Sequence, residues 1–261
     1  MPDVAAERSI AVRTRALTRK FGAFTAVDSL DLEVHEGEIF GFLGANGAGK
    51  TTTIKILCGL LLPTSGTGTV AGFDILTQSE DIKRSIGYMS QKFSLYDDLS
   101  VRENLEFYAG LYGMGPGRLA RRLDDLVPRL QLADHLDKVT ASLPMGWKQR
   151  VAVAAATVHD PAIVFLDEPT GGVDPVSRRA FWGLIDGLAR SGKTVFVTTH
   201  YMDEAEYCHR ISVMNAGRII ALGSPADLKA QAGLATIQDL FLSLVRRDQP
   251  AGPGPHGGTS R

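Results

Sequence analysis

Apolar and polar residues alternate along the first part of the chain. Ser9 to Leu17 and Ala26 to Val34 follow this pattern, which is typical of half-exposed antiparallel strands. Glu36 to Glu38 reads as a turn, and the glycine-rich stretch TSGTGTVAGFDI after Pro63 indicates a second turn and another short strand. We therefore expect a small antiparallel β-subdomain near the beginning of the fold.

Three later segments are mainly apolar, which is typical of parallel strands buried on both faces. They cover residues 86–91, 163–166 and 194–198. Polar side chains stand at their ends, and in an open α/β sheet the carboxyl ends of the strands form the edge where ligands bind. These end residues are Gln91, Asp167, Glu168 and His200.

Helical spacing of apolar residues appears between the strands. It extends from Ser100 to Leu136, and a further helix is expected from Trp147 to Val158, so an inserted α-helical subdomain should cover about residues 92–158. Thr236 to Val245 has the pattern of a short amphipathic helix. The expected division is one nucleotide-binding domain over residues 9–233, a short helix over 234–247 and a disordered Pro- and Gly-rich tail over 248–261.

The segment from Glu38 to Leu57, EIFGFLGANGAGKTTTIKIL, passes from an apolar strand through a glycine-rich turn into a helix. Its spacing G-x-x-x-x-G-K-T is that of a phosphate-binding loop. The glycines at 44, 47 and 49 are expected to allow positive φ, so that successive N–H groups form an anion nest. A chance glycine turn before an ordinary helix is the alternative, which the order of strand, loop and helix disfavours.

This loop predicts specific contacts with a nucleotide. Lys50 should reach the β- and γ-phosphates, Thr51 should place its hydroxyl group on Mg²⁺, and Thr52 should bind the α-phosphate. The residues expected to surround the phosphates are Gly44, Ala45, Asn46, Gly47, Ala48, Gly49, Lys50, Thr51 and Thr52.

The strand ends supply the remaining chemistry. Asp167 is suited to hold Mg²⁺ through its water shell, and Glu168 to orient or deprotonate the attacking water. Gln91 is a candidate ligand for Mg²⁺ or that water, and His200 a candidate sensor of the γ-phosphate. The alternative for Asp167 and Glu168 is that they only cap the next helix. The alternative for His200 is that it is an ordinary surface histidine. Phe21 is a candidate for stacking on the nucleobase, with a core or turn position as the alternative.

Composition limits the classes of protein that fit. The chain has 261 residues, of which 44% are hydrophobic and 22% charged, and a net charge of -1. It can form one large core, and this charge gives no general attraction to nucleic acid, so no nucleic-acid partner is expected. The longest apolar runs are too short to cross a bilayer and no signal peptide precedes them, which predicts a cytosolic chain. Cys58 and Cys208 lack metal-ligand spacing and are expected to be buried apolar residues.

Taken together, these motifs resemble the nucleotide-binding subunit of an ABC transporter, from Ile10 to Leu228. The matching segments are Walker A at Gly44 to Thr51, the Q-loop at Gln91, Walker B at Ile163 to Asp167 followed by Glu168, the D-loop at Gly171 to Asp174, the switch at His200 and the A-loop at Phe21. The resemblance implies an α/β P-loop NTPase with a RecA-like core, and ATP and Mg²⁺ as ligands. It also implies a pair of such domains, with each ATP between Walker A of one and the signature motif of the other.

The signature motif departs from the family pattern Leu-Ser-Gly-Gly-Gln. The matching residues here are Leu143, Pro144, Met145, Gly146 and Trp147. Pro144 lacks the hydroxyl and N–H groups that would approach the partner's γ-phosphate, and losing one hydrogen bond to a charged group costs about 1.5–3 kcal/mol. The following helix still points its positive end at the same place, so we expect a modified composite site to which Met145 and Gly146 contribute.

The segments after Gln91 and His200 resemble ABC-2 type drug and polysaccharide exporter ATPases. This resemblance implies a peripheral subunit on the cytoplasmic face of the plasma membrane that drives a separate ABC-2 type permease, with export of a drug-like or lipophilic molecule. Phe93, Leu95 and Tyr96 would receive a helix of the permease or belong to the subdomain core. The alternatives are a soluble ABC ATPase of translation or DNA repair and a weakly hydrolysing regulatory member, the latter because of Pro144.

Overall fold

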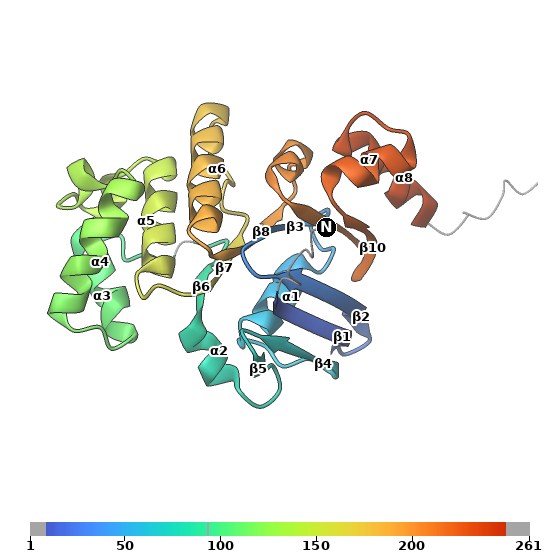
Figure 1. The fold of residues 1–261 in the computed structure, drawn as a ribbon, viewed down its shortest axis with the longest axis horizontal. Coiled ribbons are helices and arrows are strands. Elements are labelled where there is room, and N and C mark those ends of the chain that lie inside the picture. The colour runs from blue at the N-terminus through green and yellow to red at the C-terminus, as the bar shows by residue number, and fades with distance from the viewer. Residues whose placement is uncertain (1–8, 93, 249–261) are drawn as a thin grey trace, which may run out of the picture.

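A twisted, mostly parallel sheet forms the centre of the computed structural model, which describes residues 9–92 and 94–248 (Figure 1). Within these residues its strand order is β10-β9-β3-β8-β7-β6, and only β10 pairs in the antiparallel sense. The strands are β3 (Ile39–Leu43), β6 (Ile86–Met89), β7 (Ile163–Asp167), β8 (Thr194–Thr199), β9 (Arg210–Asn215) and β10 (Arg218–Gly223).

The strands at the middle of this sheet are buried on both faces, as the uninterrupted apolar runs predict. Every residue of β3, β7 and β8 is buried. The rings of Phe40, Phe42, Phe165 and Phe196 cluster on one face, together with α1 (Lys50–Leu57) and the second sheet. Alternate residues, such as Val164 and Val195, join the core on the other face with α5 (Met145–Thr157) and α6 (Pro175–Arg190).

An antiparallel sheet of order β2-β1-β4-β5 lies beside α1, as the alternating pattern predicts (Figure 1). Its strands are β1 (Ile10–Phe21), β2 (Phe24–His35), β4 (Ser65–Val70) and β5 (Phe73–Asp74), and α2 (Ser79–Ser85) follows them. The first two strands are longer than predicted, because they continue to a tight hairpin in which Phe21 pairs with Phe24. The predicted α/β class with an antiparallel β-subdomain is confirmed.

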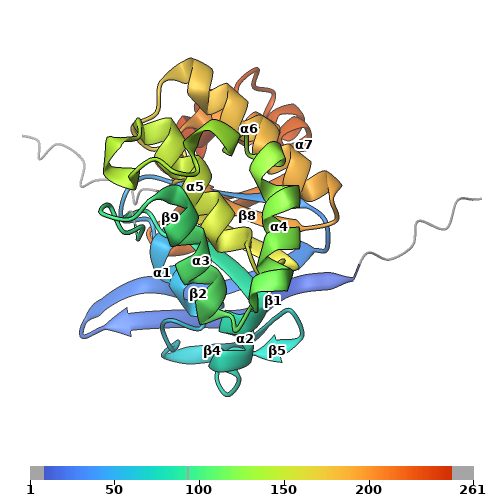
Figure 2. The ribbon, with the colours of Figure 1, turned by 90° about the vertical axis from the view of Figure 1, so that its left-hand side faces the viewer.

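A group of helices projects from one end of the parallel sheet and faces the viewer in Figure 2. It contains α3 (Val101–Leu111), α4 (Pro116–Arg129) and α5, joined by the short 3-10 helices η1 (Ala133–His135) and η2 (Thr140–Ser142). Ser100 caps α3 through a reciprocal pair of hydrogen bonds with Glu103, which fixes where this helix starts. The predicted boundaries of the helical subdomain, about 92 and 158, stay a prediction.

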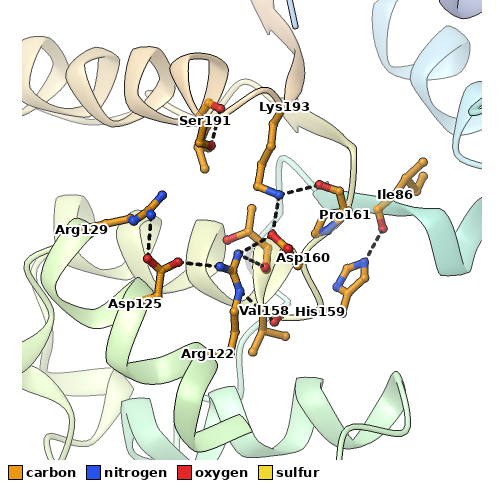
Figure 3. Close-up of polar contacts among 12 residues, drawn as sticks. Ile86, Arg122, Asp125, Arg129, Val158, His159, Asp160, Pro161, Ser191 and Lys193 are labelled. Atoms are coloured by element: carbon orange, nitrogen blue, oxygen red, sulfur yellow. Dashed lines mark hydrogen bonds and ion pairs between the residues drawn. The ribbon is translucent and has the colours of Figure 1, made fainter. Parts of the chain in front are cut away.

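Arg122 of α4 joins these helices to the core (Figure 3). Its guanidinium group donates to the backbone oxygens of Thr157 and Val158, at 3.0 and 3.3 Å, and so binds the carboxyl end of α5. It also lies 3.1 Å from the carboxylate of Asp160, which pairs at 2.7 Å with Lys193 from the connection between α6 and β8. One carboxylate is therefore shared by a cation of the helical group and a cation of the core.

The last part of the described chain lies at the opposite end of the molecule from α3 and α4 (Figure 1). It contains η3 (Met202–Tyr207), α7 (Pro225–Ala232) and α8 (Ile237–Asp248), which packs on η3. The structure has α8 where the sequence indicates a helix over Thr236 to Val245. Most of the predicted disordered tail, from residue 249 on, lies outside the described residues.

The buried His159 predicts a pH-dependent loss of stability. Its Nε2 donates to the carbonyl of Ile86 at 3.0 Å, its ring stacks on Tyr112, and burial lowers its pKa to about 4. The imidazole of His159 binds a proton near pH 6.5 in the unfolded chain but only near pH 4 in the folded one. The contribution of the neutral ring to the free energy of unfolding is therefore fully present above pH 6.5 and is lost as the pH falls toward 4. We expect this histidine to lower the free energy of unfolding by about 2 kcal/mol between pH 7 and pH 5.

Denaturant unfolding of the wild type and His159→Gln at both pH values measures this effect. The variant should lose less stability on acidification, since it carries no titrating group at this position. Equal losses in the two proteins would contradict the assignment.

Candidate active site

The loop between β3 and α1 curves tightly around its glycines. Gly47 and Gly49 have φ of 83° and 105°, a region that residues with a Cβ avoid. Gly44 does not lie in that region, but a Cβ there would stand 2.7 Å from the backbone oxygen of Met214 in β9. The predicted positive φ is therefore confirmed at Gly47 and Gly49 and wrong at Gly44, where the close approach of β9 requires glycine instead.

Lys50 begins α1, and its side chain is almost completely buried. Its Nζ donates to the backbone oxygens of Gly44 and Ala45 at 2.7 and 3.2 Å and lies 3.8 Å from Oε1 of Glu168. Burial lowers the pKa of Lys50, and the charges of Glu168 and Asp167 oppose this shift. The ammonium group is thus held at the helix N-terminus, where phosphate groups bind.

Asp167 ends β7 and is 1% exposed. Its Oδ1 accepts hydrogen bonds from the hydroxyl groups of Thr198, at 2.6 Å, and Thr51, at 3.3 Å. Its Oδ2 is buried without a hydrogen-bond partner among the described residues. Burial raises the pKa of Asp167, whereas the bonds from Thr198 and Thr51 lower it.

These residues fit a magnesium ion. An unpartnered buried carboxylate oxygen next to a threonine hydroxyl offers hard oxygen ligands, and Mg²⁺ in nucleotide sites takes one or two carboxylates and completes its shell with phosphates and water. Residues 9–92 and 94–248 contain no group of three His, Cys, Asp or Glu side chains that could hold a metal by itself. Asp167 and Thr51 thus offer such an ion one carboxylate and one hydroxyl oxygen.

Glu168 is the residue on which the other predicted side chains converge. Its Oε2 accepts a hydrogen bond of 2.8 Å from the amide of Gln91, and Nδ1 of His200 lies 3.5 Å from the same oxygen. The His200 contact does not have hydrogen-bond geometry, so it is an ion pair only when the imidazole is protonated. The φ of Glu168 is 50°, a strained value for a residue with a side chain and one that recurs at functional sites.

A cavity opens between the phosphate-binding loop and Glu168. It is lined by Phe24, Ala26, Asn46, Gly47, Gly49, Lys50, Thr51, Thr52, Gln91 and Glu168. Of the contacts predicted for this loop, Gly44, Ala45 and Ala48 are not in its lining, and Ala48 is buried.

The aromatic residue in this lining is Phe24, with a side chain that is 63% exposed. Phe21 is absent from it, and the guanidinium carbon of Arg19 lies 4.5 Å from the centre of its ring. The two phenylalanines are cross-strand partners at the hairpin end, so Phe21 pairs with a residue that lines the cavity. Stacking of a base on Phe21 stays a proposal, and Phe24 is a second candidate that sequence reasoning missed.

The signature residues are not part of this cavity. Met145 and Gly146 line a separate one with the D-loop residues Gly172 to Asp174. Pro144 is the N-cap of α5, one position before the first helical residue. Gln149 of the same helix donates to the backbone oxygen of Gly171 at 3.1 Å, which ties the signature helix to the D-loop.

Comparison with known proteins identifies the family. Residues 27–171 match the ABC transporter family. This chain belongs to the ABC transporter ATP-binding family. The ABC domain is 46% identical over 239 residues to the probable multidrug ABC transporter ATP-binding protein YbhF of Escherichia coli K12, an alignment that covers 90% of this chain and 41% of YbhF. The chain therefore spans about two fifths of the length of that relative.

Two further matches agree with this assignment. The ABC domain is 38% identical to the daunorubicin resistance ATP-binding protein DrrA3 of Streptomyces coeruleorubidus, over 85% of this chain and 71% of DrrA3. It superimposes with a TM-score of 0.73 and 26% identity on the dimeric post-hydrolysis structure of the ATP-binding cassette MJ0796 with ADP and phosphate, over 82% of this chain and 98% of that one. The predicted family and P-loop NTPase fold are confirmed.

Thr198 is a residue of the ABC domain site that sequence reasoning missed. Its hydroxyl group donates to Oδ1 of Asp167 and accepts the backbone N–H of Glu168 at 2.8 Å, so it holds the carboxylate of Asp167 and the backbone of Glu168. The available signal was its place at the end of an apolar strand, two residues before His200.

Replacing Thr198 with valine should slow ATP hydrolysis. The change keeps the shape of this fully buried side chain and removes one hydrogen bond to a charged group, which is worth about 1.5–3 kcal/mol, so the turnover rate should fall by about 10- to 100-fold. A phosphate-release assay measures this rate.

Thr194→Val is the matched control, because Thr194 is buried at the other end of β8 and its hydroxyl accepts only the Gly37 N–H among the described contacts. Stability should fall there without a change in turnover. Equal turnover in the two variants would contradict the role of Thr198.

Proposed function

We propose that this ABC domain binds ATP with Mg²⁺ and hydrolyses it, with Glu168 as the acceptor of the water proton. The observation that supports this is the meeting of Glu168 with Lys50, Gln91 and His200 at one edge of the sheet. Beside them lies a buried carboxylate oxygen of Asp167 that has no hydrogen-bond partner among the described residues. Phosphoryl transfer depends on positioning and on stabilising charge, and these groups supply both.

Each residue has a distinct task in this proposal. Lys50 transfers its hydrogen bonds from the loop carbonyls to the β- and γ-phosphates, and Thr51 and Asp167 hold the metal. Magnesium, when bound, would neutralise the charge on the phosphate oxygens. Gln91 holds the Glu168 carboxylate toward the attacking water, and His200 binds the γ-phosphate from the side of β8.

We propose that the complete site needs a second ABC domain. Among the described residues, no signature residue lines the cavity around Lys50. Met145 and Gly146 line a cavity with the D-loop, and Met145 also lines one with Gln91 and Glu168. The similar cassette MJ0796 is a dimer in its structure with ADP and phosphate. In this arrangement the start of α5 approaches the nucleotide bound to the partner.

We further propose that hydrolysis drives export through a separate ABC-2 type permease, at the cytoplasmic face of the plasma membrane. The support comes from YbhF and DrrA3, whose names describe a probable multidrug transporter and daunorubicin resistance. A drug-like or lipophilic substrate follows from that likeness. The described helices include none with the length and apolar character needed to span a bilayer.

The surface that would meet the permease is beside the Q-loop. Leu95 is partly buried against the core, Tyr96 is 45% exposed, and Phe107 of α3 packs on Tyr96 edge-on. Such apolar residues suit the insertion of an amphipathic helix. Phe93, which was named for the same role, lies outside the described residues.

The substitution Glu168→Gln tests the assigned proton acceptor. It keeps the shape and removes the basic group, so turnover should fall by about 100- to 10,000-fold while ATP binding persists. Size-exclusion chromatography with ATP should then show a long-lived dimer. A variant that hydrolyses ATP at the wild-type rate would refute the role of Glu168.

The alternative function is that of a regulatory domain that hydrolyses ATP weakly. The observation that favours it is Pro144 at the N-cap of α5, because a serine at this position would cap the helix with its side chain. Pro144→Ser restores a hydroxyl group that could reach the partner's nucleotide. We expect turnover to rise by about tenfold, as for one hydrogen bond to a charged group.

Pro144→Ala is the control for the loss of the proline ring alone. A rate that equals that of the wild type in both variants would remove the argument that the missing serine weakens this site.

A further inference from the structure

Glu204 is a completely buried carboxylate outside the cavity at the phosphate-binding loop. It belongs to η3, the 3-10 helix that follows β8. Its Oε1 accepts the hydroxyl of Thr170 and its Oε2 accepts the hydroxyl of Thr199, both at 2.6 Å. Both are short hydrogen bonds, and a buried carboxylate needs partners of this kind to offset the loss of water.

The two threonines come from the two loops that carry the reacting groups. Thr170 stands two residues after Glu168, and Thr199 immediately precedes His200. The hydroxyl of Thr199 also accepts the backbone N–H of Tyr201 at 2.9 Å. Thr199 therefore bonds both Glu204 and the residue that follows His200. Through Thr170, Glu204 also connects this turn to the loop of Glu168.

Arg178 adds a third connection. It lies in the first turn of α6, directly after the D-loop, with its Nε 3.7 Å from Oε1 of Glu204. Its guanidinium carbon is 3.9 Å from the centre of the Tyr201 ring. The cation partly compensates the buried charge and joins α6 to the same network.

We propose that Glu204 is a positioning residue for ATP hydrolysis, which bridges the Glu168 loop and the His200 turn so that both side chains stay aligned with the γ-phosphate. This role rests on the proposed function. Glu204 acts through Thr170 and Thr199, so its loss should change the rate of the chemical step more than the affinity for ATP.

Steady-state ATP hydrolysis by the full chain tests the role, with kcat expressed per nucleotide-binding site. Glu204→Gln weakens both bonds and should lower kcat by about 10- to 100-fold, as a small misplacement of reacting groups does, with the KM for ATP within about twofold of the wild type. Thr170→Val and Thr199→Val each remove one of the two bonds at nearly constant volume. Each should lower kcat, and they keep the test decisive if Glu204→Gln does not fold.

Glu206→Gln is the matched control, since Glu206 lies on the same 3-10 helix, is exposed and pairs with Lys229 at 2.6 Å. Its kcat should equal that of the wild type. A second readout is the combination of Glu204→Gln with His200→Ala. If Glu204 works by holding His200, the two effects should combine to less than their product, whereas a loss of stability alone would leave them independent.

The outcomes separate this inference from the proposed function. A wild-type chain that shows no ATP turnover contradicts the proposed function and this role with it. A wild type that hydrolyses ATP, together with an unchanged kcat in Glu204→Gln and in both threonine variants, overturns the role of Glu204 alone. A raised KM with unchanged kcat also overturns it, because that result describes a binding residue.

Discussion

The parallel pairing of β3, β8, β7 and β6 is the constraint on which the site depends. Because these strands run in one direction, residues that are far apart in the sequence meet at their carboxyl ends: the phosphate-binding loop, His200, the pair Asp167 and Glu168, and Gln91. The middle strands are buried on both faces, and a slip of one residue would exchange those faces. The packing of the core thus fixes the register of the strands, and with it the positions of the polar residues at their carboxyl ends.

Several residues at the carboxyl edge of the parallel sheet make unfavourable contributions to the free energy of folding. Lys50 and Asp167 are buried charges, one oxygen of Asp167 has no partner among the described residues, and Glu168 has a strained backbone. An unsatisfied buried polar atom and a strained φ each cost about 1–3 kcal/mol. The buried aromatic cluster of Phe40, Phe42, Phe165 and Phe196 lies on the same strands, and its burial offsets this cost. In the proposed function, a magnesium nucleotide supplies partners for these groups, so its binding should stabilise this edge.

Sequence reasoning recovers the parts of the protein that short-range rules determine. The glycine spacing around Lys50 and the apolar strand before Asp167 are local signals, and they place the loop, the strands and their end residues correctly. What it misses depends on contacts between distant segments. The strands β9 and β10 are not identified, and the glycine at position 44 is required by Met214 of β9 rather than by its own φ. Thr198 and Glu204 act through partners in other segments, at 31 and 34 residues' separation, which no local pattern reveals.

The loop after β7, residues 168–174, carries Glu168 and also contacts the helix that follows the signature motif. Glu168 begins it, Thr170 is bound by Glu204, and the oxygen of Gly171 accepts the amide of Gln149 from the signature helix. Asp174 ends it and caps α6 by accepting the N–H groups of Val176 and Ser177. A nucleotide on the partner that draws the start of α5 toward it therefore pulls on the same seven residues that carry the proton acceptor. In the proposed dimer, a change at Pro144 at the start of α5 would therefore act through a helix that is hydrogen-bonded to the loop of Glu168.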